Sequence, residues 1–137
     1  MAGSNNGEQF LASEPEMDMT QFRHVEYDLK YADQSENQIL DIIYPDEGEG
    51  PFPLIIVFHG GAFVMGHKRT HYISSMCQPV TQGYAVETAE YRLVQEALWT
   101  AQLIDGKAAI RYLRVNAERL NPDPERFAVW GNSAGEP

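Results

Sequence analysis

The sequence predicts an α/β fold in which two leading strands are followed by a mostly parallel sheet with crossover helices. Unbroken apolar runs at residues 54–58 (LIIVF) and 127–130 (FAVW) are typical of strands buried on both faces. Segments with helical character at 70–82 and 99–120 stand between the later strands. Alternation of strands and helices implies right-handed crossovers, and therefore parallel pairing of those strands.

Length, composition and charge limit the possible functions. The 137 residues suffice for one domain with a real core, and 43% of them are hydrophobic. The net charge of −10 belongs to the first 50 residues, which carry 12 acidic and 2 basic side chains. Because the remainder is balanced and offers no basic stripe, we expect no nucleic-acid partner.

No apolar run reaches the length of a membrane span, and the N-terminal residues lack the features of a secretory signal. The single cysteine, Cys77, excludes a disulfide framework and is most simply a small buried residue. These features predict a cytoplasmic protein with no membrane contact.

The first part of the chain divides into a leader and two strands. Residues 1–20 are polar and aperiodic, which predicts a disordered acidic leader, and residues 21–137 form the N-terminal part of one domain. Residues 22–31 and 38–44 alternate as strands with one wet face, and they could pair antiparallel. A turn rich in proline and glycine at 45–53 leads into the first buried strand.

The later elements alternate between helix and strand. The helical segment at 70–82 ends at Gly83, and a strand is expected at 85–91. A longer helix at 99–120 is closed by two prolines, and the last strand follows at 127–130. Apolar or small residues at steps of three and four predict the core-facing stripe of the longer helix: Leu103, Gly106, Ile110, Leu113, Ala117 and Leu120.

A G-x-S-x-G motif, Gly131-Asn132-Ser133-Ala134-Gly135, follows the last strand directly. This motif forms a sharp strand-to-helix turn that exposes the serine hydroxyl, and the flanking glycines are needed because a Cβ would clash there. The turn also directs the backbone N–H of Ala134 towards the same point. Ser133 is therefore the candidate nucleophile.

A second motif, His59-Gly60-Gly61-Ala62-Phe63, follows the third predicted strand. Glycines at this place let the main chain approach a substrate closely, and preorganised N–H groups stabilise a tetrahedral oxyanion. The plain alternative is a tight turn. A G-x-S-x-G motif together with this loop favours the oxyanion interpretation.

The chain resembles the α/β-hydrolase esterases and lipases related to hormone-sensitive lipase, and the neighbouring feruloyl-esterase-like acetyl esterases. The resemblance covers residues 38–135 and lies in three ordered segments, HGGAF, AEYRL at 89–93, and DGKAAIRYLRVNAERLNPDPERFAVWGNSAG at 105–135. It implies an α/β-hydrolase fold and a serine carboxylesterase that acts on small-molecule esters without a cofactor or metal.

The resemblance also implies roles for single residues. Ser133 is the nucleophile, and His59 braces the oxyanion loop by hydrogen bonding instead of acting as the base. The YRL segment and Asp105 are implied to be structural. The implied oxyanion donors are the N–H groups of Gly61, Ala62 and Ala134, with Gly60, Gly131 and Gly135 in support.

The sequence departs from the family at three places. Ala62 stands where the family has a smaller residue, which still leaves its N–H available. Glu87 lies within a strand that should be buried, where an unpaired carboxylate would cost several kcal/mol or become protonated. The family's triad acid and histidine follow the serine, whereas here only Glu136 and Pro137 follow Gly135.

Two functions follow. The first is a carboxylic ester hydrolase, represented by a chain truncated before the triad acid and base and so inactive as given. The alternative is a non-catalytic pseudoenzyme or gene fragment with a binding role at most. His67 and His71 have the spacing of metal ligands, but without a convergent carboxylate we expect no metal site.

Overall fold

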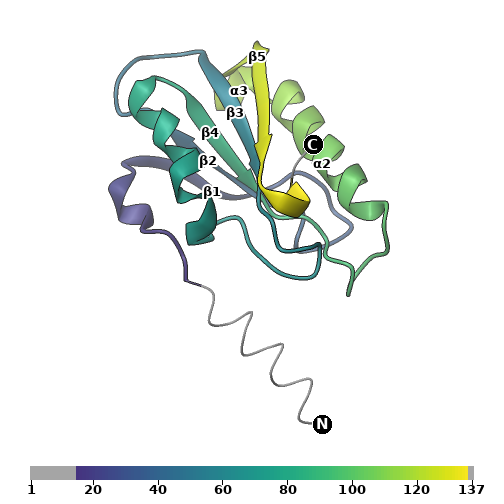
Figure 1. Ribbon diagram of the computed structural model, residues 1–137. Coiled ribbons are helices and arrows are strands. Elements are labelled where there is room, and N and C mark those ends of the chain that lie inside the picture. Colours follow the sequence, from purple (N-terminus) through teal and green to yellow (C-terminus); the bar gives the residue numbers. More distant parts are fainter. Residues whose placement is uncertain (1–14, 136–137) are drawn as a thin grey trace.

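The computed structural model describes residues 15–135, which form a five-stranded sheet with helices on its two faces (Figure 1). The elements in chain order are η1 (Met19–Gln21), β1 (His24–Lys30), β2 (Ile39–Tyr44), β3 (Phe52–Phe58), η2 (His71–Gln82), β4 (Ala85–Ala89), α2 (Ala101–Val115), α3 (Ala117–Leu120), β5 (Pro122–Gly131) and η3 (Ser133–Gly135).

The strand order β1-β2-β4-β3-β5 confirms the predicted fold class. β1 pairs with β2, and β2 with β4, in the antiparallel sense, whereas β3 pairs in parallel with both β4 and β5. Because β3 lies between β4 and β5, the chain segments that follow β3 and β5 leave the sheet side by side at its carboxyl edge.

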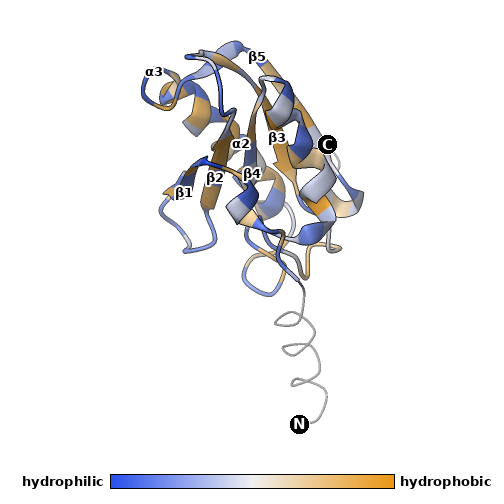
Figure 2. Cartoon of the chain, turned by 90° about the vertical axis from the view of Figure 1, so that its left-hand side faces the viewer, coloured by the Kyte–Doolittle hydropathy of each residue, from blue (hydrophilic) through white to orange (hydrophobic). Residues whose placement is uncertain are grey.

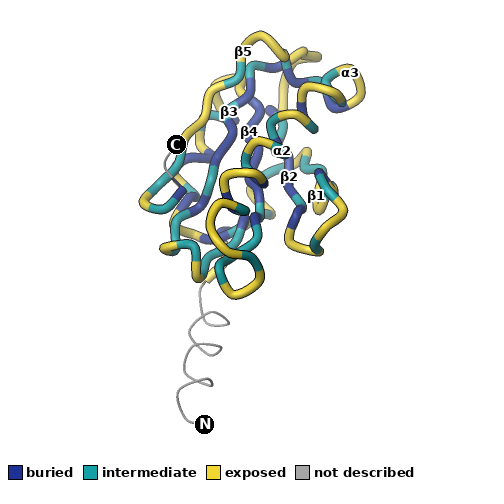
Figure 3. The backbone as a smooth tube through the Cα atoms, turned by 90° about the vertical axis from the view of Figure 1, so that its right-hand side faces the viewer, coloured by how far each residue is buried: buried dark blue, intermediate teal, exposed yellow. Residues whose placement is uncertain are grey.

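The core has two layers, one on each face of the sheet. On one face, η2 packs Ile73, Met76 and Cys77 against Val57 and Val86. On the other, α2 packs Ala109 and Leu113 against a larger cluster from β2, β3 and β4. The hydrophobic strands β2 and β3 lie at the centre of the molecule (Figure 2), whereas β5, an edge strand among the described residues, is largely exposed (Figure 3).

The prediction of a wet face on residues 38–44 is wrong. β2 lies between β1 and β4 with both faces covered, and its residues from Leu40 to Ile43 are buried. The inward Asp41 is tolerated because Arg69 Nε donates to its carboxylate at 2.8 Å. The alternation of charge and apolar residues therefore reflected a buried ion pair.

The leader prediction is partly wrong. Residues 1–14 lie outside the described part of the chain, but residues 15–20 are structured. Glu16 forms an antiparallel bridge with Thr70, and the Met17 N–H donates to the Arg69 carbonyl at 2.8 Å. The Met17 side chain joins the core cluster beneath η2, so apolar burial fixes a segment whose composition suggested disorder.

The long predicted helix is interrupted, and its predicted stripe is buried only in part, at Leu113 and Leu120. It breaks at Asn116 into α2 and α3, and Asn121 in the left-handed conformation ends it. Leu103 and Ile104 are about half exposed. The buried face of α2 consists of Gln102, Asp105, Ala109 and Leu113.

Polar residues replace leucine on this face because they bind the loop at 90–97. The last strand also begins earlier than predicted, at Pro122, a position where proline costs no ladder hydrogen bond.

Candidate active site

Ser133 occupies a strained turn at the end of β5. Its φ of 51° is unusual for a residue with a side chain, and the Gly135 N–H closes the turn on the Asn132 carbonyl at 2.9 Å. A Cβ on Gly135 would collide with the backbone carbonyl of Phe58. Gly131 ends the strand opposite Phe58 in the parallel register. The turn is thus held directly against the end of β3.

The loop that follows β3 contains three consecutive residues with positive φ: Gly61 at 126°, Ala62 at 54° and Phe63 at 63°. The N–H groups of Val64 and Met65 both donate to the Gly61 carbonyl, at 3.0 and 3.1 Å. Among the backbone hydrogen bonds of the described residues, none has the N–H of Gly61 or Ala62 as donor. These two donors remain available to another acceptor.

The two motifs meet in space. A Cβ on Gly60 would lie 2.9 Å from the Asn132 carbonyl oxygen and 3.2 Å from the Ser133 Cβ. Gly60, Gly61, Asn132 and Ser133 line one hollow of about 170 Å³, together with Met65, Gly66, Thr70 and Tyr72. Only a glycine at position 60 allows this approach.

Ala134 lies beside a second, apolar hollow of about 200 Å³. Phe63 and Trp99 form its aromatic wall, with ring centroids 5.2 Å apart. Of the predicted donors, Gly61 lines the hollow of Ser133, Ala134 the neighbouring one, and Ala62 neither.

His59 is buried beneath the loop, with 1% of its surface exposed. Its Nδ1 lies 2.7 Å from the Gly60 carbonyl oxygen, and its ring stacks on Tyr91 at 4.3 Å. The Tyr91 hydroxyl donates to the His59 carbonyl at 2.6 Å. These contacts fit the bracing role expected of His59 and account for the tyrosine of the YRL segment.

A partly buried charge cluster lies below the loop and was not predicted from the sequence. The Lys68 ammonium lies 2.7 Å from Asp28 and 3.3 Å from Asp41, and the Lys68 N–H donates to the Glu90 carboxylate at 2.5 Å. Burial is the main reason that the pKa of Glu90 rises to about 7, while Lys68 opposes the rise. No spacing in the sequence predicts this cluster, because its members come from separate elements.

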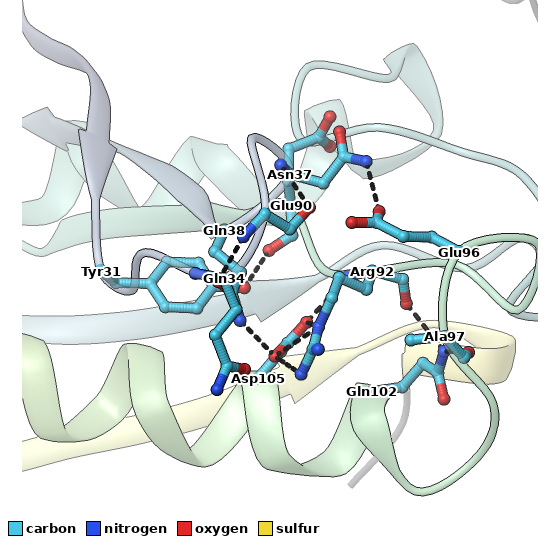
Figure 4. Close-up of polar contacts among 11 residues, drawn as sticks. Tyr31, Gln34, Asn37, Gln38, Glu90, Arg92, Glu96, Ala97, Gln102 and Asp105 are labelled. Carbon is cyan, nitrogen blue, oxygen red and sulfur yellow. Dashed lines mark hydrogen bonds and ion pairs between the residues drawn. The ribbon is translucent and has the colours of Figure 1, made fainter.

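Asp105 has the structural role that the resemblance implied. Its carboxylate receives Arg92 through Nε and Nη2, at 3.0 and 2.8 Å, and the Gln38 amide at 2.9 Å (Figure 4). Gln102, one turn before Asp105, donates to the carbonyls of Arg92 and Ala97. α2 therefore anchors the loop that carries Tyr91, and Tyr91 in turn contacts His59 in the loop that follows β3.

The remaining candidates take no part in the site. His67 accepts from the Arg69 N–H at 3.3 Å, and His71 lies 3.2 Å from the Pro15 carbonyl. No group of three potential metal ligands exists among residues 15–135. Cys77 is buried, which raises its pKa to about 12.

Glu87 is fully buried, as its place in a central strand predicted. Neither carboxylate oxygen has a partner among the described residues. Burial, with Asp41 adding to it, raises the pKa of Glu87 well above the usual range.

Among residues 15–135, no helix is long and apolar enough to cross a membrane.

Comparison with known proteins gives a consistent result. A family model described as BD-FAE matches residues 40–136. The carboxylesterase NlhH of Mycobacterium tuberculosis is 33% identical over 94 residues, which cover 69% of this chain and 30% of NlhH. The esterase LipI of the same organism is 36% identical over 91 residues, which cover 66% of this chain and 28% of LipI.

A solved structure of a truncated carbohydrate esterase from gut microbiota matches with a TM-score of 0.78 and 32% identity. The match covers 88% of this chain and 43% of that one. The chain thus spans less than half the length of each of these three relatives.

Proposed function

Because this chain belongs to the BD-FAE family of α/β-hydrolase esterases, we propose that it carries the nucleophile and oxyanion apparatus of a carboxylic ester hydrolase. Ser133 attacks the ester carbonyl. The N–H groups of Gly61, Ala62 and Ala134 receive the oxyanion. The observation that carries this proposal is the shared hollow of Ser133 and Gly61, next to a loop whose N–H donors are free for another acceptor.

The chemistry follows from the positions of these groups. Attack by the serine oxygen turns the planar carbonyl into a tetrahedral centre, and its oxygen gains negative charge. A preorganised backbone donor there is worth about 2.7–4 kcal/mol in the transition state. His59, Gly60, Gly131 and Gly135 support this geometry by fixing the two turns against each other. The names of the relatives point to esters as substrates, and the proposal takes these to be small-molecule esters.

We also propose that the 137 residues alone turn over esters poorly. Among the described residues, no histidine or carboxylate lines the hollow of Ser133. Without a general base the hydroxyl is a weak nucleophile, and removal of the base lowers turnover by roughly 10⁴-fold or more. A longer protein that supplies an acid and a histidine would regain that factor.

Labelling with a fluorophosphonate tests the nucleophile directly. We expect intact-mass analysis to show one adduct on the parent chain, located at Ser133 by peptide mapping and formed over hours. Ser133→Ala should give none, whereas Ser75→Ala, which removes another exposed serine, should label like the parent. A folded parent chain that stays unlabelled would leave the non-catalytic alternative standing.

Hydrolysis of p-nitrophenyl acetate tests the missing base. We expect the parent and Ser133→Ala to release p-nitrophenol at the same slow rate, even when the fluorophosphonate labels Ser133. Fast hydrolysis that depends on Ser133 would show that these 137 residues contain a complete catalytic unit.

A further inference from the structure

We propose that Glu90 is a positioning residue of the oxyanion loop, which it fixes by holding both ends of the segment 59–68 at once. This inference rests on the proposed function, because the loop matters only if it receives an oxyanion. Glu90 does not line the hollow of Ser133 and so acts through other residues.

Glu90 directly follows β4, and two hydrogen bonds fix its backbone. Its N–H donates to the Ile39 carbonyl at 2.8 Å, and its carbonyl accepts from the Tyr31 hydroxyl at 2.7 Å. Both of its backbone polar groups are therefore bonded to elements outside the loop. The carboxylate extends from a fixed point of the sheet.

The carboxylate reaches both ends of the loop. At the far end, Oε1 accepts from the Lys68 N–H at 2.5 Å. At the near end, the same oxygen lies 3.8 Å from Nε2 of His59, whose other ring nitrogen lies 2.7 Å from the Gly60 carbonyl. Since 3.8 Å is too long for a hydrogen bond, this second link is Coulombic and depends on charge.

The loop needs such restraint. Ala62 and Phe63 both have positive φ, a conformation that costs side-chain-bearing residues about 1–3 kcal/mol and persists only when the surroundings enforce it. If the ends of the loop moved, the positions of the Gly61 and Ala62 N–H groups relative to Ser133 would change.

The charge of Glu90 changes near neutrality. Burial raises its pKa to about 7, Asp41 adds to the rise, and Lys68 and Arg69 oppose it. The other titratable groups facing it are His59, Tyr31 and Tyr91. Above pH 7 the ionised carboxylate attracts an Nε2–H of His59, and only a doubly protonated ring offers Nδ1–H to the Gly60 carbonyl oxygen at the same time. Below pH 7 this attraction is lost.

Nuclear magnetic resonance of the 137-residue chain tests the linkage without turnover. We expect the carboxyl carbon of Glu90, the ring of His59 and the amides of Gly61 and Ala62 to share a titration with a midpoint near pH 7. Glu90→Gln keeps an acceptor for Lys68 but has no charge, so the shared step should vanish from the His59, Gly61 and Ala62 signals. Glu118→Gln, an exposed substitution on α3, should leave it in place.

The rate of Ser133 labelling by the fluorophosphonate gives the functional readout. At pH 8 we expect Glu90→Gln to label about tenfold more slowly than the parent and Glu118→Gln, with the gap closing at pH 6. Glu90→Asp, which restores the charge on a shorter arm, should recover part of the rate.

The outcomes separate the two proposals. A shared step that persists in Glu90→Gln belongs to His59 itself, and equal labelling rates would show that Glu90 does not position the loop; either result overturns the inference. If neither the parent nor any variant is labelled, but the parent shows the shared titration by NMR, the proposed nucleophile is wrong. The link between Glu90 and the loop is then still supported.

Discussion

At the scale of single residues, Glu87 is the clearest conflict between sequence and environment. It stands in β4 with its carboxyl group fully buried and both oxygens unpaired among the described residues. Its raised pKa means that the group is buried as a neutral acid, which avoids the larger cost of a buried charge. An unsatisfied polar group still costs about 1–3 kcal/mol.

Replacing this side chain by an apolar one of similar length should therefore stabilise the protein. We expect Glu87→Met to raise the free energy of unfolding by about 1–3 kcal/mol, measured by urea denaturation at pH 7. Glu118→Met, at an exposed site, should change it little. A less stable Glu87→Met chain would mean that the carboxyl group has a partner that favours the folded state.

Gly135, in the nucleophile motif, and Gly106, in α2, offer a matched pair of alanine substitutions. Gly135→Ala places a methyl group against the Phe58 carbonyl and should destabilise the turn by about 1–3 kcal/mol and abolish fluorophosphonate labelling. Gly106→Ala, inside α2, meets only the Phe58 ring at 3.4 Å and should stabilise the helix by about 0.5–1 kcal/mol. Thermal unfolding of both variants measures the contrast. Equal labelling of Gly135→Ala and the parent would contradict the tight turn.

How well the sequence predicted these residues depends on whether their contacts come from the same turn or from other elements. The motifs predicted tight turns at Gly60 and Ser133, whereas the contact of Gly60 with Asn132 and that of Gly135 with Phe58 come from other elements. Glu90 and Lys68 depend on the side-by-side placement of β2, β4 and the loop, which no spacing encodes.

At the scale of elements, β5 is the strand that most favours association between chains. Val129 and Trp130 are 38% and 45% exposed on an edge strand, and unpaired apolar edges favour association between chains. The unbroken apolar run at 127–130 predicted a strand buried on both faces, whereas most residues of β5 are exposed.

A lysine on this edge should reduce self-association. We expect Val129→Lys to lower the apparent mass of concentrated samples in light scattering after size exclusion, because a charged edge disfavours pairing. Val115→Lys makes the same chemical change at the exposed end of α2, where Val115 is 83% exposed, and should have no such effect. Identical behaviour of the two variants would place the association elsewhere.

The α2 helix shows where periodicity is a poor guide. The predicted stripe assigned Leu103 to the core, but Gln102 and Asp105 take the buried face because Arg92 and the 90–97 loop need partners there. Leu113 and Leu120 are buried as periodicity predicted, whereas tertiary hydrogen bonds decide which residues are buried in the first turns of α2.

At the scale of the whole molecule, the buried acids should shape the dependence of stability on pH. The folded pKa of Glu90, about 7, lies above its ordinary value of 4.5, so the folded state holds the proton more tightly than the unfolded state. Its stabilising contribution is full below pH 4.5 and is lost as the pH rises to about 7.

Comparison with a neutral variant isolates this contribution. We expect the stability of Glu90→Gln relative to the parent to rise by roughly 3 kcal/mol between pH 4.5 and pH 8, measured by urea denaturation at each pH. The acidic residues whose pKa is lowered, such as Asp28, act in both chains and cancel in the difference. A difference that does not change with pH would mean that Glu90 titrates normally in the folded chain.

The arrangement of β3 and β5 has a consequence for how the candidate site comes into being. Phe58 and Gly131 pair in register although they lie far apart along the chain, with η2, β4 and α2 between them. Closure of so long a loop is slow, and among the described strands β5 pairs with β3 alone. The alcohol of Ser133 and the amide of Gly61 therefore have no shared geometry until the last strand has docked. The appearance of fluorophosphonate labelling at Ser133 during refolding should therefore report when β5 pairs with β3.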